Sequence, residues 1–213
     1  MAAAKPRCHA GFRPVTPSIS PTRVPEDPEI FGLNRHIRRV CDDFAQAGFL
    51  VVAPAYFDRI GPNLEFGYDD FEGARGVVRQ LSDTQTMLDT QAAIDAVRVA
   101  GKVAVIGYCW GGFIAYLANC RLELTAAVSY YGTRILQYLG EAPRAPMLYH
   151  WGELDQGLPP QEVARIEAAR PEGTHRIYAG AQHGFNCDDR ASYKPDAAAE
   201  AFDRTVSFLR AHL

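Results

Sequence analysis

The sequence lacks any concentration of basic residues. Its 213 residues include 22 Lys and Arg against 25 Asp and Glu, which gives a formal net charge of −3. Proteins are attracted to a nucleic-acid backbone or to an anionic membrane surface through clusters of positive charge. We therefore expect neither nucleic acid nor a membrane as a partner.

Cysteine is sparse, and its spacing shows no pairing. No CxxC pair occurs among the five cysteines, which are Cys8, Cys41, Cys109, Cys120 and Cys187. An odd number without paired spacing does not suit a disulfide framework, so we expect reduced thiols and a cytoplasmic protein. No pair of histidines has metal-ligand spacing with a third acid or thiol, and the sequence therefore predicts no metal site.

Long apolar segments are also missing. No stretch approaches the about 20 apolar residues that a membrane-spanning helix requires. The first residues contain no apolar core of a secretory signal. The composition, 47% hydrophobic and 22% charged, is that of a globular protein, and the length favours a single core. We expect one monomeric domain.

Prolines are concentrated in the first 28 residues. They are Pro6, Pro14, Pro17, Pro21, Pro25 and Pro28. Proline lacks an amide donor and has a fixed φ, so it is excluded from the centre of a sheet. We therefore predict an irregular proline-rich arm over residues 1–28, without a central strand, and a globular domain over residues 29–213. A sheet that lacks its central strand would make the protein less stable than its length suggests.

Helical and strand patterns alternate over the rest of the chain. The expected helices cover residues 35–47, 84–99, 113–119, 160–169 and 195–213, and the expected strands cover residues 49–56, 103–106, 125–131, 146–151 and 175–178. Such alternation predicts a parallel sheet with helical crossovers. Residues 59–83 are rich in glycine and charge and predict a loop with a short helix over a site.

One segment has the pattern of a nucleophile elbow. Residues 107–112 read GYCWGG and lie between an expected strand and an expected helix. A turn this sharp strains the nucleophile, so Gly107 and Gly111 are needed two residues to either side of Cys109. At a helix N-terminus Cys109 is expected to form a thiolate, and the N–H of Trp110 can face an oxyanion. The alternative is a small buried cysteine beside an ordinary turn.

An acid and a histidine follow in the chain order nucleophile, acid, histidine. Asp155 comes just after an expected strand, where open α/β sheets place their sites. Glu153 is the rival acid, and a turn or helix-capping role is the alternative for Asp155. His183 lies on a glycine-flanked loop before the last helix, where a solvated loop histidine is the alternative. The histidines expected to be structural or on the surface are His9, His36, His150, His175 and His212.

These motifs resemble the dienelactone hydrolase (carboxymethylenebutenolidase) family. The resemblance rests on EIFGLN at 29–34, APAY at 53–56, the elbow, YYG at 130–132, Asp155, and HGFN at 183–186. It implies an α/β-hydrolase fold with a mostly parallel sheet flanked by helices, here with the N-terminal strands missing or altered. It also implies an EC 3.1.1-type hydrolase that cleaves a small ester or lactone without a cofactor.

The resemblance further implies roles for individual residues. Cys109, His183 and Asp155 would form a catalytic triad. The backbone N–H groups of Ile30 and Trp110 would form the oxyanion hole. A glutamate in the position of Glu29 would contact the resting thiol and help to generate the thiolate. The residues expected to contact the substrate are Tyr131, Arg75 and Phe185.

The sequence departs from the family at two places. Family members that cleave dienelactone hold the substrate carboxylate with arginines, but Cys187 and Phe71 stand at those positions, with Arg75 nearby. The proline-containing TRVPEDP segment precedes EIFG in place of an apolar strand. Two further functions therefore stay open: a thioesterase or cysteine peptidase with the same triad, and an inactive α/β-hydrolase-like binding protein.

Overall fold

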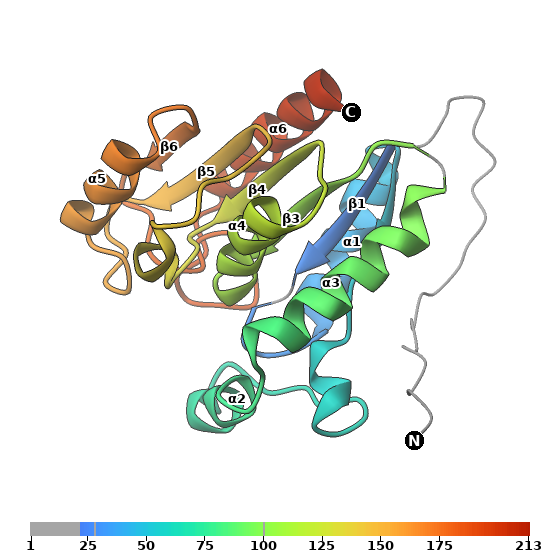
Figure 1. Ribbon diagram of the computed structural model, residues 1–213. Coiled ribbons are helices and arrows are strands. Elements are labelled where there is room, and N and C mark those ends of the chain that lie inside the picture. Colours follow the sequence, from blue (N-terminus) through green and yellow to red (C-terminus); the bar gives the residue numbers. More distant parts are fainter. Residues whose placement is uncertain (1–21, 28, 100) are drawn as a thin grey trace.

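A computed structural model describes residues 22–27, 29–99 and 101–213. The strands in these ranges form one parallel sheet in the order β2-β1-β3-β4-β5-β6 (Figure 1). Their bounds are β1 (Thr22–Asp27), β2 (Phe49–Val52), β3 (Ala104–Tyr108), β4 (Ala126–Tyr130), β5 (Met147–Gly152) and β6 (Thr174–Tyr178). The predicted parallel sheet is confirmed.

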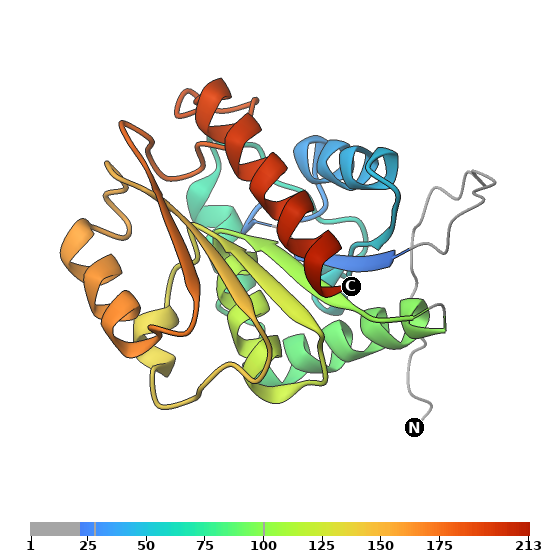
Figure 2. The same ribbon diagram turned by 90° about the horizontal axis from the view of Figure 1, so that it is seen from above.

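Helices cover both faces of the sheet. Figure 2 shows α1 (Arg35–Gln46) and α6 (Pro195–His212) on one face, and α3 (Asp83–Arg98) and α4 (Trp110–Arg121) on the other. The remaining helices are α2 (Phe71–Val78), α5 (Pro160–Ala169) and the short 3₁₀ helices η1 (Tyr56–Arg59) and η2 (Ile135–Tyr138). Within the described ranges, no helix combines the length and the apolar character needed to cross a bilayer.

The alternation of side chains along β3 explains this layered arrangement. Ala104, Ile106 and Tyr108 belong to the large core that includes α1 and α6. Val105 points the other way and belongs to a smaller core with Ile94 of α3. Successive strand residues face opposite sides of a sheet, so a strand covered on both faces is apolar throughout.

The predicted absence of a central strand before residue 28 is wrong. β1 lies between β2 and β3 in the sheet. Residues 22–25 pair with β2, whereas Glu26 and Asp27 pair with β3. Pro25 therefore forms the last pair with β2, and the next residue already pairs with β3. The amide donor that proline lacks would have been at the end of the ladder with β2, where its absence disturbs the sheet least. The rest of the predicted arm, residues 1–21 and 28, lies outside the described residues.

Asn34 determines where the EIFG segment turns into α1. Its side-chain oxygen accepts a hydrogen bond from the backbone N–H of Ile37 at 3.1 Å, which is the usual geometry of a helix N-cap. Its side-chain nitrogen donates to the hydroxyl of Tyr68 at 3.0 Å. The start of α1 is thus attached to the loop between η1 and α2, and both lie beside the carboxyl end of β1.

Candidate active site

Cys109 lies in a strained turn between β3 and α4. Its backbone has a φ of 56°, in the left-handed region that non-glycine residues seldom occupy. A Cβ at Gly107 would lie 1.9 Å from the carbonyl oxygen of Gly111, and one at Gly112 would lie 2.8 Å from the Cα of Gly132. Glycine is therefore required at position 107 and at position 112, and the sharp turn between β3 and α4 is present; the predicted need for glycine at position 111 stays a prediction.

The fold brings Cys109, His183 and Asp155 into one line of contacts. The Nε2 atom of His183 lies 3.0 Å from Sγ of Cys109, and its Nδ1 atom lies 2.8 Å from Oδ2 of Asp155. The three residues follow β3, β6 and β5, so they meet at the carboxyl edge of the parallel sheet. This edge is where open α/β sheets bind their ligands.

The structure distinguishes Asp155 from the rival acid Glu153. The side chain of Asp155 is 2% exposed, and its Oδ1 atom accepts backbone N–H groups from Gly157 at 2.8 Å and Leu158 at 3.1 Å. Its other oxygen is thereby directed at His183. Glu153 instead accepts the N–H of Gly180 at 2.7 Å. The acid that orients the histidine ring is therefore Asp155.

The charges of its neighbours strengthen the basicity of His183. Burial by itself lowers the pKa of this imidazole. The negative charge of Cys109 and the hydrogen bonds to Asp155 and Cys109 outweigh that effect and raise the pKa of His183 to about 10. The imidazole therefore holds a proton through the neutral range when Cys109 carries a negative charge.

Glu29 lies in the same region and contacts Tyr131 and Arg190. It is fully buried, and its Oε1 atom accepts a hydrogen bond from the hydroxyl of Tyr131 at 3.4 Å and lies 3.7 Å from Nη1 of Arg190. Its Oε2 atom has no hydrogen-bond partner in the described part of the chain. The Cys109 sulfur faces His183, and the expected contact between Glu29 and the resting thiol stays a prediction.

Arg190 is a residue of this region that the sequence analysis missed. Its guanidinium lies over the rings of Tyr68 and Phe31, with the carbon atom 5.6 Å and 6.0 Å from their centres, and its side chain is 17% exposed. Its position seven residues after His183, on the same loop, is the only indication in the sequence. A positive charge therefore lies beside Glu29 even though Cys187 replaces the family arginine.

Tyr131 and Phe185 support the histidine from below. Both are 0% exposed, and the ring of Tyr131 lies 5.0 Å from that of His183 and 5.3 Å from that of Phe185. Burial, together with the charge of Glu29, raises the pKa of Tyr131 well above its ordinary value, so its hydroxyl stays protonated. The ring of Tyr131 therefore helps to hold His183 in place, Phe185 packs behind Tyr131, and both buried rings offer little surface to a substrate.

The two amides of the expected oxyanion hole lie near the elbow. Trp110 is the first residue of α4, so its N–H has no partner within the helix. Ile30 follows β1, whose Asp27 pairs with Gly107, and it belongs to the same core as Cys109. Arg75 is not brought to this site: its side chain is 56% exposed and pairs with Glu72 on its own helix at 3.9 Å.

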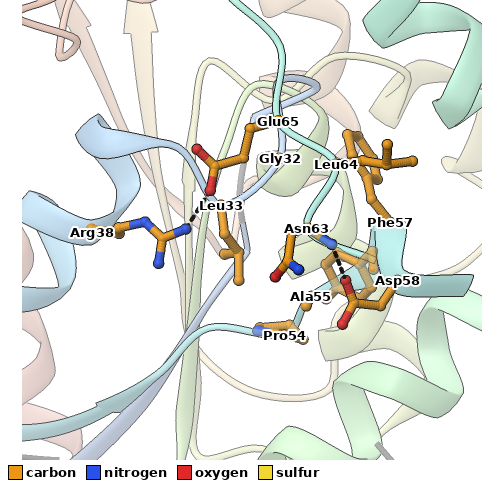
Figure 3. A pocket seen from close by; sticks show the side chains of 11 residues that line it. Gly32, Leu33, Arg38, Pro54, Ala55, Phe57, Asp58, Asn63, Leu64 and Glu65 are labelled. Carbon is orange, nitrogen blue, oxygen red and sulfur yellow. Dashed lines mark hydrogen bonds and ion pairs between the residues drawn. The ribbon is translucent and has the colours of Figure 1, made fainter. Parts of the chain in front are cut away.

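A cavity of about 290 Å³ lies beside the EIFG segment (Figure 3). Arg38 and Glu65 form an ion pair at its edge, and the backbone N–H of Asn63 donates to Asp58 at 3.1 Å. Cys109, His183 and Asp155 are not among the residues that line it. Its wall residues Tyr56 and Phe57 pack against Trp110, with ring centres 5.5 and 6.3 Å apart, so the cavity adjoins the start of α4.

The chain is similar to proteins of one family over most of its length. The profile of the dienelactone hydrolase family matches residues 27–213. A protein of Synechocystis sp. named "Putative carboxymethylenebutenolidase" is 32% identical over 206 residues, which cover 87% of this chain and 84% of that protein. A protein of the same name from Yersinia pestis is 30% identical and covers 98% and 82%. A crystal structure of a "Putative Dienelactone Hydrolase" from Klebsiella pneumoniae has a TM-score of 0.84 at 28% identity, covering 93% of this chain and 90% of that one.

Proposed function

Because this chain belongs to the dienelactone hydrolase family, we propose that it cleaves a small ester or lactone with Cys109 as the nucleophile. The observation that carries the proposal is the line of contacts from Cys109 through His183 to Asp155, with distances of 3.0 and 2.8 Å. The reaction would be of the carboxymethylenebutenolidase type, EC 3.1.1, without a cofactor.

The first half of the proposed reaction acylates the enzyme. The thiolate of Cys109 attacks the carbonyl carbon, a C–S bond forms, and the carbonyl electron pair moves onto the oxygen. The N–H groups of Trp110 and Ile30 stabilise this oxyanion. When the carbonyl re-forms, the C–O bond breaks, and the imidazolium of His183 protonates the leaving oxygen.

The second half releases the acid. Neutral His183 takes a proton from water, and the hydroxide attacks the thioester carbon. The C–S bond then breaks, the Cys109 thiolate is restored, and His183 is again the imidazolium that pairs with it. Asp155 holds the ring in the tautomer that this cycle needs and stabilises its positive charge.

The substrate class depends on charge as well as on the triad. Cys187 and Phe71 occupy the family's arginine positions, which favours a substrate other than dienelactone. Arg190 nevertheless supplies a cation 3.7 Å from Glu29. We propose that the EIFG segment holds Glu29 beside Arg190 to balance this positive charge.

We also propose that the enzyme acts on small molecules and that it is a cytoplasmic monomer.

An activity screen tests the proposal. Aryl esters, lactones, thioesters and peptides are offered to the purified protein and to the Cys109→Ala and Cys120→Ala variants. Cys120 is a buried cysteine outside the site and serves as the matched control. Ester or lactone turnover that is lost only in Cys109→Ala is expected. Preference for thioesters or peptides would favour the alternative enzyme, and binding without turnover would favour an inactive hydrolase-like protein.

A further inference from the structure

A second group of reactive side chains lies where α1 meets the loop after His183. His36 of α1 and Cys187 and Asp188 of the loop present nitrogen, sulfur and oxygen atoms that all lie within 4.8 Å of one another. His36 and Asp188 lie 152 positions apart in the sequence, so only the fold brings these side chains together. We propose that these three residues bind a divalent transition-metal ion of the zinc class.

The donor set determines the class of metal. Imidazole nitrogen, thiolate sulfur and a carboxylate oxygen together suit Zn²⁺ and its neighbours in the transition series. Mg²⁺ and Ca²⁺ prefer oxygen ligands and would not select a thiol. Three protein ligands leave the fourth tetrahedral position to a water molecule, so the site would hold a zinc-class ion with one open position.

His36 presents one of its two ring nitrogens to the proposed site. The residue is 3% exposed, and its Nε2 atom is buried without a hydrogen-bond partner in the described part of the chain. Its Nδ1 atom lies 3.3 Å from Oδ1 of Asp188. A buried ring nitrogen without a partner is destabilising. The ion would bind Nδ1, the ring atom that faces Asp188, whereas Nε2 is directed to the other side of the ring and would not be a ligand.

The surrounding charges permit a cation. Asp188 pairs with Arg39, but Arg39 also lies 2.9 Å from Oδ2 of Asp189 and keeps that partner if Asp188 turns to a metal. The side chain of Asp188 is 46% exposed, so it can rotate to shorten the distances to the values of a coordination shell. Burial raises the pKa of Cys187 to about 11; the negative charge of Glu29 adds to this shift, and the positive charge of Arg190 opposes it.

Binding requires the Cys187 thiol to lose its proton. Its S–H now contacts the hydroxyl of Tyr68 at 3.0 Å. On binding, the sulfur donates an electron pair to the metal and the proton is released to solvent, so the metal itself undergoes no change of oxidation state. Affinity should therefore rise with pH.

An ion at this position would join the His183 loop to α1. The backbone N–H of Cys187 donates to the carbonyl of Gly184 at 2.9 Å, and Gly184 follows His183 directly. The proposed site is separate from the triad and does not depend on its function. The test can therefore be made in a protein whose nucleophile has been removed.

The experiment uses the full chain with Cys109→Ser, so that the triad thiol cannot bind the probe. Co²⁺ is titrated while the sulfur-to-cobalt charge-transfer absorption is recorded, and Zn²⁺ is then used to displace it. We expect one equivalent of Co²⁺ to bind per chain and to produce this absorption. Adding Cys187→Ser should abolish the band and weaken Zn²⁺ binding by about tenfold or more, whereas adding Cys120→Ser should change neither.

Two results would overturn the proposal: no stoichiometric binding in the Cys109→Ser protein, or an unchanged band when Cys187 is replaced. His36→Gln provides a second variant in case the serine at 187 prevents folding, and it too should weaken binding. A Zn²⁺-dependent rise in the unfolding temperature that disappears in either variant would support the site, because a ligand of the native state stabilises it.

Discussion

The Nε2 atom of His183 lies 3.0 Å from the Sγ atom of Cys109. This distance is short enough for a proton to pass between the two side chains. The pKa of His183, raised to about 10, means that the imidazole keeps its proton through the neutral range when the thiolate is present. The proposed nucleophile and its proposed proton donor thus share one contact, and several measurable properties depend on it.

We predict that Cys109 is the thiol alkylated first at neutral pH. Burial raises the pKa of both Cys120 and Cys187 to about 11, with Glu141 and Glu29 adding to the respective shifts, so these two thiols stay protonated. Peptide mapping after brief iodoacetamide treatment measures the order. Faster labelling of Cys187 would show that the elbow sulfur is not an accessible thiolate. Cys8 lies outside the described residues, and we expect it to be labelled more slowly than Cys109.

We predict that hydrolysis declines as the pH rises through about 10, because His183 then loses the proton that it gives to the leaving oxygen. Asp155→Asn removes a negative charge that helps to raise this pKa, so the decline should move to lower pH in the variant. The pH dependence of kcat for a neutral ester measures both. An alkaline decline at the same pH in the two proteins would contradict the assigned role of Asp155.

We predict that His183→Ala reduces kcat/KM by about 10³-fold or more, with the fold intact, because the proton carrier is lost. Asp155→Asn should cost less, since Asp155 orients the histidine and transfers no proton. Glu153→Gln is the matched control because Glu153 bonds to Gly180 and not to the imidazole. If Glu153→Gln cost more than Asp155→Asn, the acid would have to be reassigned.

Much of the fold could be predicted from local patterns. The helix expected over residues 160–169 is α5, and α1 ends one residue before the expected limit. β2 ends at Val52 although the apolar run continues to Tyr56, because Tyr56 begins η1. β1 was missed since proline argues against a central strand, and only the register shows that Pro25 ends one ladder just before the other begins.

The candidate site was predictable where its residues carry local motifs. The elbow around Cys109, the strand end before Asp155 and the loop of His183 can each be recognised in a few consecutive residues. Arg190 and His36 have no such motif, because their partners lie far away in the sequence and meet them only in the folded chain. The contacts of Glu29 with Tyr131 and Arg190 could not be predicted for the same reason.

We predict that Asp189→Asn lowers kcat with little change in KM. Asp189 accepts hydrogen bonds from Arg35 and Arg39 of α1, and so attaches the His183 loop to that helix. These bonds lower the pKa of Asp189 although burial opposes them, so the carboxylate is charged at neutral pH. Loosening the loop displaces His183 from its catalytic position, and we expect kcat to fall by up to about 100-fold. Glu200→Gln, which breaks an exposed ion pair on α6, is the matched control. Equal effects of the two variants would refute a positioning role.

We predict that protonation of His150 destabilises the protein in mild acid. His150 is fully buried, with Nδ1 at 2.8 Å from the hydroxyl of Tyr178 and Nε2 at 2.9 Å from the hydroxyl of Thr205. Burial, aided by the charges of Arg204 and Arg176, lowers the pKa of His150 from 6.5 to about 3. Between pH 6.5 and about pH 3, His150 therefore binds a proton in the unfolded chain but stays neutral in the folded chain. The free energy of unfolding should be unaffected by this group above pH 6.5, and should fall by about 1.4 kcal/mol for each pH unit from there towards pH 3.

Urea unfolding at pH 8 and at pH 5 measures the effect, because other groups that titrate between these values cancel when wild type and variant are compared. His150→Gln removes the titrating group while keeping an amide that can hydrogen-bond. The wild type should lose about 2 kcal/mol more than this variant between the two pH values. His212→Gln, at the end of α6, is the matched control. The decrease in the free energy of unfolding between pH 8 and pH 5 should be as large in His212→Gln as in the wild type. If His212→Gln reduced this decrease as much as His150→Gln does, the buried imidazole of His150 would not be its cause.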